Sequence, residues 1–215
     1  MSDALSDYYQ ERASEYEAVY AKPERQGDLA RLRQWLSEEV RGGSVLEVAC
    51  GTGYWTRVAA STAHSIVAID RNPGPLALAR SQSPPPNVRY LEADAFALPE
   101  CGQAFDTGMA HFWWSHLLFK QRAGFLAHWG SRLSARAKVL MIDNRFVPGS
   151  STPIARRDAS GNTYQLRRLR NGASYEVVKN FTSAAELRSA LAPAFPDIEV
   201  LELGYYWAVR ARRHG

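Results

Sequence analysis

The chain has 215 residues, of which 46% are hydrophobic and 22% charged, which is ordinary for one folded domain with a sizeable core. Its formal net charge is +4, and the excess of Arg and Lys after residue 130 suits either an anionic partner or a solvated basic surface. The two cysteines, Cys50 and Cys101, form no disulfide or zinc-binding pattern. Because the sequence has no long apolar run and no signal peptide, it predicts a cytoplasmic protein that does not span a membrane.

The first forty residues predict two helices. Apolar and aromatic side chains recur at helical spacing over 4–20 and again over 25–40, and Pro23 separates the two segments. One stripe of the first helix is rich in tyrosine and contains Tyr8, Tyr9, Arg12 and Tyr16. This helix either packs on the domain or closes over a ligand site as a lid, and the two roles are compatible.

Strands and helices then alternate as far as residue 143. The expected strands cover 44–49, 65–70, 88–91, 105–111 and 138–143. The expected helices cover 54–61, 73–80 and 115–133. This alternation predicts an α/β fold with a parallel, doubly wound sheet of the Rossmann-like kind.

The pattern changes after residue 143. Two strand-like segments flank Asn171-Gly172, a strong hairpin signal, and a capping box at Ser183 begins a further helix. Two final strands are expected over 198–203 and 205–211. We therefore expect one domain over 1–215 with four parts: a helical lid (1–41), a ligand-binding core (44–143), a hairpin insertion (147–182), and a final helix with strands (183–215).

The most informative segment is Glu47-Val48-Ala49-Cys50-Gly51-Thr52-Gly53, which spans the end of the first strand and the turn after it, while Asp70 ends the second strand. Glycines let the backbone approach a ligand, the next helix directs free N–H groups toward it, and a terminal carboxylate can accept both hydroxyls of a ribose. Thr56 stands where a dinucleotide-binding fingerprint has its third glycine, and no phosphate-binding Lys-Ser/Thr pair follows. The pattern thus predicts a nucleoside ligand rather than a dinucleotide.

This segment resembles motif I of the class I S-adenosylmethionine-dependent methyltransferases, and the resemblance extends over 44–143 and the last two strands. It implies a seven-stranded sheet, S-adenosylmethionine as cofactor and S-adenosylhomocysteine as product. Asp94 and Phe96, after the third strand, match the positions that bind the adenine edge and flank its ring. The residues that we expect to bind the cofactor are Tyr16, Glu47, Ala49, Gly51, Gly53, Tyr54, Trp55, Asp70, Arg71, Asp94, Ala95, Phe96 and His111.

Several stretches are similar to the group that contains the dehydrophos phosphonate O-methyltransferase, among them Tyr8 to Tyr16 and Gly51 to Thr56. This resemblance implies a mobile lid and a hairpin that supplies cations for an acidic acceptor. The acceptor-binding residues that we expect are Arg167, Lys179, Tyr175, Trp113 and His116. The chain departs from that group at Lys22-Pro23, where a lid tyrosine would stand, and at Phe112, where a histidine would stand.

The register of the hairpin decides whether Arg167 and Lys179 share a face. A two-residue turn at Asn171-Gly172 would pair 167 with 176 and direct the two cations to opposite faces. A three-residue loop over 170–172, with Gly172 left-handed, would pair 167 with 175 and bring them to one face. Because the resemblance implies that both cations meet one acceptor, we predict the three-residue loop.

We therefore expect methyl transfer to a small molecule, with an oxygen acceptor that bears or adjoins an anionic group. An anionic oxygen needs no base, whereas a phenol or amine would require one, and His116 or His111 is the expected supplier. No metal, nucleic acid or membrane partner is expected. The alternatives are a tRNA or rRNA methyltransferase, a non-catalytic cofactor-binding protein and a nucleotide-dependent oxidoreductase.

Overall fold

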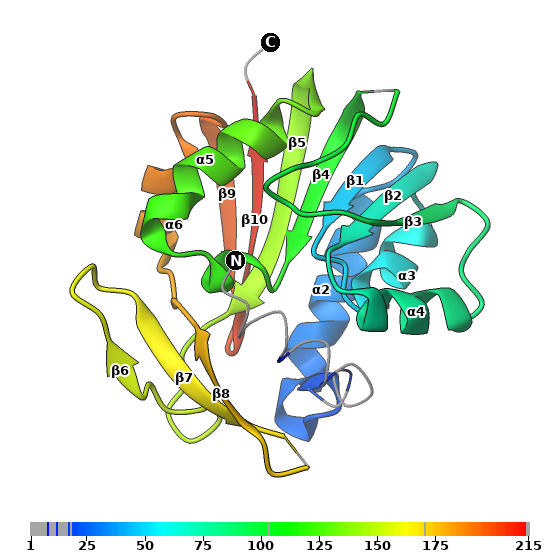
Figure 1. Ribbon diagram of the computed structural model, residues 1–215. Coiled ribbons are helices and arrows are strands. Elements are labelled where there is room, and N and C mark those ends of the chain that lie inside the picture. The colour runs from blue at the N-terminus through cyan, green and yellow to red at the C-terminus, as the bar shows by residue number, and fades with distance from the viewer. Residues whose placement is uncertain are drawn as a thin grey trace.

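The computed structural model describes residues 8, 12, 17, 19–102, 104–169 and 171–213. Its main sheet has seven strands in the order β3-β2-β1-β4-β5-β10-β9 (Figure 1). In that order they are β3 (Val88–Glu92), β2 (Ser65–Asp70), β1 (Ser44–Val48), β4 (Phe105–His111), β5 (Leu133–Asn144), β10 (Tyr206–Arg212) and β9 (Asp197–Glu202). The first five strands pair in parallel, and β10 is antiparallel to both of its neighbours. The α/β expectation is confirmed.

Helices cover both faces of this sheet. Apolar residues of α5 (Phe119–Gly130) and α6 (Ala184–Leu191) pack on one face. The other face is covered by α2 (Gln26–Glu39), α3 (Tyr54–Ala60) and α4 (Pro73–Ser81). Successive side chains of a strand point to opposite faces of the sheet: Met109 of β4 packs on the side of α2, α3 and α4, and Ala110 on the side of α5 and α6. Among the described residues, no helix is long and apolar enough to cross a membrane.

The helix expected over 115–133 is wrong at both ends. The short 3-10 helix η3 (Trp114–His116) comes first, and α5 begins only at Phe119. The extended Leu118 precedes α5, and its backbone N–H donates to Oε1 of Gln121 at 2.9 Å, which fixes the start of the helix there. Strand β5 begins at Leu133 because that residue already pairs with Phe105 across an irregularity in the ladder.

A second sheet has the order β6-β7-β8 and contains β6 (Arg156–Arg157), β7 (Thr163–Arg168) and β8 (Ser174–Val178). In the β7–β8 pair Arg167 lies opposite Tyr175, and Gly172 has a φ of +88°. The predicted register is therefore confirmed, although Arg170 of the connecting loop lies outside the described residues. The two-residue strand β6 was not expected from the sequence.

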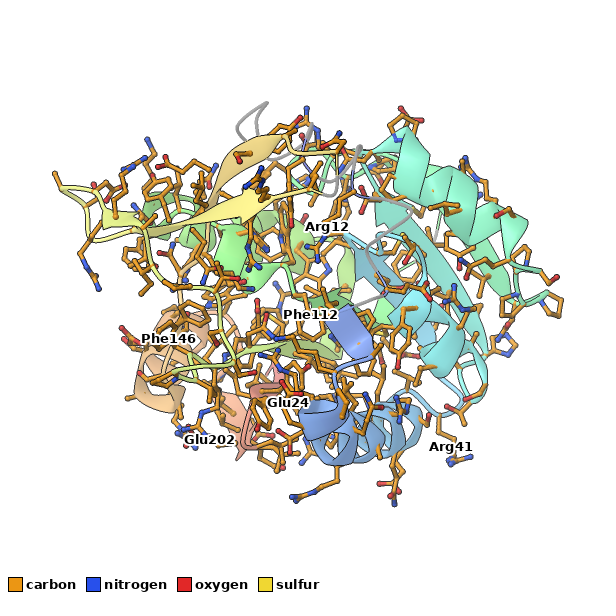
Figure 2. The ribbon with its side chains drawn as sticks, turned by 90° about the horizontal axis from the view of Figure 1, so that it is seen from below. Arg12, Glu24, Arg41, Phe112, Phe146 and Glu202 are labelled. Carbon is orange, nitrogen blue, oxygen red and sulfur yellow. The ribbon has the colours of Figure 1, made fainter. Side chains whose placement is uncertain are left out.

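Seen from below in Figure 2, the β7–β8 hairpin and α2 lie on opposite sides of Phe112. The short 3-10 helix η2 (Pro23–Arg25) precedes α2. The helix expected over 4–20 falls largely outside the described residues, as do Tyr9 and Tyr16.

Candidate functional site

The glycine-rich turn connects β1 to α3 in left-handed backbone conformations. Ala49, Gly51 and Gly53 have φ values of +54°, +57° and +77°. A Cβ atom at Gly53 would lie 2.6 Å from the hydroxyl of Tyr90, so both its backbone angle and its packing require glycine. The N–H of Gly51 donates to Oδ2 of Asp70 at 2.9 Å, which ties the turn to the end of β2.

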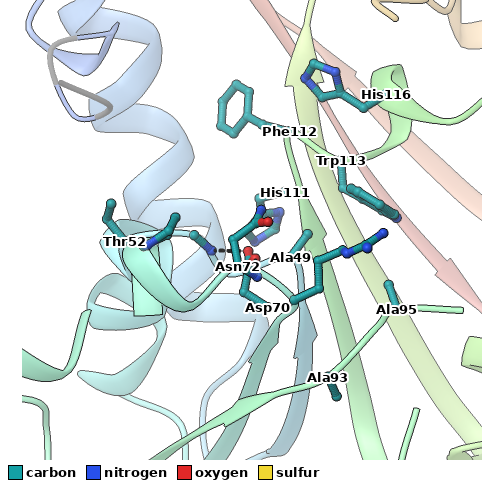
Figure 3. A pocket seen from close by; sticks show the side chains of 13 residues that line it. Ala49, Thr52, Asp70, Asn72, Ala93, Ala95, His111, Phe112, Trp113 and His116 are labelled. Atoms are coloured by element: carbon teal, nitrogen blue, oxygen red, sulfur yellow. Dashed lines mark hydrogen bonds between the residues drawn. The ribbon is translucent and has the colours of Figure 1, made fainter. Parts of the chain in front are cut away.

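A cavity opens beside this turn (Figure 3). It lies at the carboxyl ends of β1, β2 and β4, where the strand order reverses and α/β folds bind ligands. We call it the first cavity. It is lined by Ala49, Gly51, Thr52, Asp70, Arg71, Asn72, Pro75, Ala93, Ala95, His111, Phe112, Trp113 and His116.

Asp70 supplies the carboxylate of the first cavity. Its Oδ1 accepts the N–H of Asn72 at 2.9 Å, in addition to the bond from Gly51. Burial raises the pKa of Asp70 above its ordinary value, and backbone hydrogen bonds from Asn72, Gly51 and Arg71 oppose that rise. A carboxylate has about four lone-pair sites, so Asp70 keeps acceptor capacity for a hydroxyl-bearing ligand.

His111 brings an unsatisfied imidazole to the same cavity. Its side chain is 5% exposed, and neither ring nitrogen has a hydrogen-bond partner within the described part of the chain. Burial lowers the pKa of His111 to about 3, so the ring is neutral at pH 7. A neutral imidazole offers one donor and one acceptor, and both remain available to a polar ligand.

Other residues that we expected to bind the cofactor lie behind the lining. Glu47 is buried beneath the turn, and Tyr54 stacks on Tyr20 with ring centroids 4.1 Å apart. Trp55 donates from Nε1 to the hydroxyl of Tyr20 at 3.2 Å. These side chains and Gly53 do not line the first cavity but pack behind the residues that do.

The expected adenine-binding pair also lies beyond the lining. Oδ1 of Asp94 accepts the N–H of Phe96 at 2.9 Å, and Oδ2 lies 3.6 Å from Nη1 of Arg71. The Phe96 ring packs on Trp113 at 6.2 Å. The neighbouring Ala93 and Ala95 line the cavity instead.

A second, larger cavity lies between η2, the end of β10 and the hairpin, and it is partly open to solvent. Phe112 and His116 line both cavities, so the two spaces meet at these side chains. Of the described residues around the second cavity, none is Asp or Glu. The cationic residues around it are Arg12, Lys22, Arg25, Arg167, Arg168 and Lys179.

Lys179 is held in a buried polar network behind the second cavity. Its Nζ donates to Oγ of Ser115 at 2.6 Å and to Oδ1 of Asp143 at 3.0 Å, and Asp143 also accepts the Ser115 hydroxyl and N–H at 2.9 Å. Burial alone would raise the pKa of Asp143, but the Lys179 charge, together with the backbone hydrogen bonds from Ser115 and Asn144, leaves this pKa below its ordinary value. The charge of Lys179 is therefore partly balanced within the protein.

His116 lies beside this network with a defined tautomer. Its Nδ1 lies 2.7 Å from the carbonyl oxygen of Val178, and because a carbonyl can only accept, Nδ1 carries the proton. Burial lowers the pKa of His116 to about 3, and the charge of Lys179 contributes. The ring is neutral at pH 7, and its Nε2 is a weak base.

The remaining expected acceptor-binding residues divide between the two cavities and the protein interior. Arg167 lines the second cavity and donates to Oγ1 of Thr152 at 3.0 Å and to Oε1 of Gln165 at 2.6 Å. Trp113 lines the first cavity rather than the second. Tyr175 is absent from the described lining of both cavities, since it packs on the Tyr8 ring at 5.8 Å.

Sequence reasoning missed several residues that line these spaces. Thr52 directly follows the motif residue Gly51, and Asn72 lies two residues after Asp70, so their proximity to the motif could have identified them. The missed residues of the second cavity include Arg25, Ser150, Thr152, Gln165, Phe181 and Tyr206. They come from distant segments with no shared motif.

Comparisons with known proteins agree with this geometry. A family described as "Methyltransferase domain" matches residues 45–136. The structure of the DhpI-SAM-HEP complex is 28% identical in sequence, covers 98% of this chain and 96% of that chain, and has a TM-score of 0.81. The DhpI-SAH complex is 25% identical with the same coverage and a TM-score of 0.79.

A third structure, the Burkholderia thailandensis 1,6-didemethyltoxoflavin-N1-methyltransferase, is 16% identical. It covers 99% of this chain and 88% of that chain, has a TM-score of 0.65, and supports the fold alone. The comparison with curated proteins found no match.

Proposed function

The chain belongs to the class I S-adenosylmethionine-dependent methyltransferases, and we propose that it transfers the methyl group of this cofactor to an anionic oxygen of a small molecule. The observation that carries the proposal is the junction of the two cavities at Phe112 and His116. One cavity suits the cofactor, and the other is lined by cations without Asp or Glu among its described residues.

The residues of the first cavity fit S-adenosylmethionine. Asp70 would accept hydroxyls of the ribose, because its carboxylate lines the cavity and retains acceptor capacity. His111 would bind a polar group of the amino-acid end, because its two buried ring nitrogens have no partner among the described residues. When bound, this cofactor supplies an electrophilic methyl group on a sulfonium.

The second cavity suits an acceptor with negative charge. Arg167 already donates to two neutral oxygen atoms, of Thr152 and Gln165, and a guanidinium can bind a carboxylate or phosphonate through two parallel hydrogen bonds. Lys179 adds a second positive group nearby. A carboxylate at neutral pH is already ionised, and a phosphonate retains at least one negative oxygen.

The state of His116 also favours an acceptor that is already ionised. Its pKa of about 3 makes it a poor general base at pH 7. The contribution of the protein would therefore be to hold the acceptor oxygen in line with the methyl group and to exclude water, which can account for a large part of a rate enhancement. Phe112 and His116 stand where this alignment would be set.

The test is a screen for methyl transfer with isotopically labelled S-adenosylmethionine and a metabolite extract, followed by identification of the labelled product. We expect label in a methyl ester of a carboxylate or phosphonate. Arg167→Gln should lower kcat/KM at least tenfold, chiefly through KM, while Arg157→Gln, at an exposed position of β6 outside the lining of the second cavity, is the matched control. Label recovered only in tRNA, or only in a neutral amine, would overturn the proposal.

A further inference from the structure

We propose that the acceptor carries a second anionic group, which Lys22 and Arg25 bind on the side of Phe112 away from Arg12 and the hairpin cations. This inference rests on the proposed function and specifies its substrate class. The acceptor would be a dianion whose two charged groups are joined by an apolar segment. One group would be methylated beside Phe112 and His116, and the other would anchor the molecule.

The strongest evidence is the state of Arg25. Its side chain lines the second cavity and is only 8% exposed. Nη2 donates to the carbonyl oxygen of Ser150 at 3.2 Å and to its hydroxyl at 2.8 Å, but Nε has no hydrogen-bond partner. No carboxylate of a described residue lies within 4.0 Å of this guanidinium. Glu24 interacts with Arg25 only from an exposed position. The buried guanidinium therefore lacks a close counter-ion, and an anion entering the cavity would be favoured here.

Lys22 places a second cation beside Arg25. Its Nζ donates to the same Ser150 carbonyl at 2.9 Å. Glu24, which is 4.0 Å from Nζ, is too weakly coupled to neutralise this pair because both side chains are more than 40% exposed and lie in solvent. Glu24 also accepts a hydrogen bond from the Ser150 hydroxyl at 3.1 Å, but it does not line the cavity. Lys22, Arg25 and Ser150 thus form a cationic site, which we call the η2 site.

The η2 site is separate from the cations of the hairpin. Burial lowers the pKa of Lys179, and the charges of Arg167 and Arg12 lower it further, which places these three cations together. In Figure 2 Phe112 is seen between Arg12 and Glu24, the neighbour of Arg25 in η2. Lys22 and Arg25 bind Ser150, whereas Arg167 binds Thr152, so the two groups contact different residues of one loop.

The wall between the two cationic groups is aromatic. Phe112 and Tyr206 pack edge to face with ring centroids 5.8 Å apart, and both line the cavity. The guanidinium of Arg25 lies over the Tyr206 ring, 5.6 Å from its centroid. A flat or apolar segment would bury surface against these rings. The lining therefore predicts two charged ends and an apolar middle.

The experiment measures binding rather than methyl transfer. Isothermal titration calorimetry with the full chain and saturating S-adenosylhomocysteine would compare α,ω-dicarboxylates from succinate to suberate with their monomethyl esters. Each diacid and its ester have nearly the same length but differ by one charge. We expect at least one diacid to bind about tenfold tighter than its ester. Arg25→Gln and Lys22→Gln should each remove most of this advantage and leave the affinity of the ester unchanged.

Two variants serve as controls. Arg31→Gln removes an exposed cation from α2 and should retain the preference for the diacid. Arg25→Lys keeps the charge and should retain part of the preference, and it replaces Arg25→Gln if the latter fails to fold. Equal affinity for diacids and esters at every length would overturn the inference, as would equal weakening of both ligands by Arg25→Gln. Rapid methylation of a monoanion in the labelled screen would refute the inference that the acceptor carries a second anionic group, while supporting the proposed function.

Discussion

Oε2 of Glu47 accepts a hydrogen bond from the Thr56 hydroxyl at 2.6 Å, directly beneath the glycine-rich turn. Glu47 belongs to β1 and Thr56 to α3, so this bond connects the strand to the helix on either side of the turn. Thr56 occupies the position where a third glycine would seat the helix in a dinucleotide site. In this chain the hydrogen bond between the buried Glu47 carboxyl and the Thr56 hydroxyl holds the helix against the strand instead.

The same contact predicts a pH dependence of stability. Burial raises the pKa of Glu47 from 4.5 to about 7, although the Thr56 bond opposes the rise. The pKa of Glu47 is higher in the folded than in the unfolded protein. Its stabilising contribution to the free energy of unfolding is therefore fully present below about pH 4.5 and is lost as the pH rises through 7. The difference amounts to roughly 3 kcal/mol at most.

Glu47→Gln should therefore flatten the pH dependence of the free energy of unfolding. Urea denaturation at pH 5 and pH 8 would measure it, and the loss of stability between these values should be smaller in the variant. Glu38→Gln, at an exposed position of α2, is the control and should follow the wild type. If Glu47→Gln and the wild type lose stability in parallel, the buried acid does not have the raised pKa.

Asp70→Asn should weaken the binding of S-adenosylmethionine. Asn has one acceptor oxygen, so it cannot serve Gly51, Asn72 and a ribose hydroxyl together as the carboxylate of Asp70 can. We expect a loss of about 1–3 kcal/mol in calorimetry, typical of a charged hydrogen bond left unmade. Asp197→Asn, at an exposed position of β9, should leave the affinity unchanged. An unaltered affinity for Asp70→Asn would remove this residue from the cofactor site.

The parts of the structure that the sequence predicted are those with local signals. The β1–turn–α3 segment and Asp70 were readable because strand burial, glycine spacing and a terminal carboxylate lie within 26 residues of one another. The register of the hairpin was predicted from the family resemblance, which requires Arg167 and Lys179 to share a face, and the pairing of Arg167 with Tyr175 confirms it. Because side chains alternate between the two faces of a strand, this register places Arg167 on the cavity side.

The parts that could not be predicted depend on contacts between distant segments. Asp143 reads as the end of a strand, and its partner Lys179 is 36 positions away. Arg25 lacks any local signal, since its burial arises from Ser150 and Tyr206. No periodicity in the sequence reports such pairings, so the composition of the second cavity required the fold.

Lys179→Met should destabilise the protein strongly, because it leaves Asp143 charged and without its cation in a fully buried position. Removing one partner of a buried ion pair costs about 3–5 kcal/mol, and the Ser115 hydrogen bonds that remain place our expectation at about 3. The double variant Lys179→Met/Asp143→Asn should recover part of the loss, since no charge is then stranded. Chemical denaturation measures both, and a double variant less stable than Lys179→Met would contradict the ion-pair explanation.

The last prediction concerns Gly172, which has a φ of +88° and no heavy atom within 4 Å of a Cβ built on it. Space is therefore not limiting, and only backbone strain opposes a side chain there. A β-branched residue resists a positive φ, whereas Asn tolerates it. Gly172→Val should shift the hairpin register, misplace Arg167 and lower the affinity for the acceptor at least tenfold.

Gly172→Asn should keep both the register and the affinity, and it is the matched control because it also adds a side chain at the turn. The readouts are calorimetric acceptor binding and the thermal stability of each variant. S-adenosylmethionine affinity should be unchanged in both, since Gly172 lies in the hairpin and does not line the first cavity. Wild-type acceptor binding by Gly172→Val would show that the left-handed turn does not set the position of Arg167.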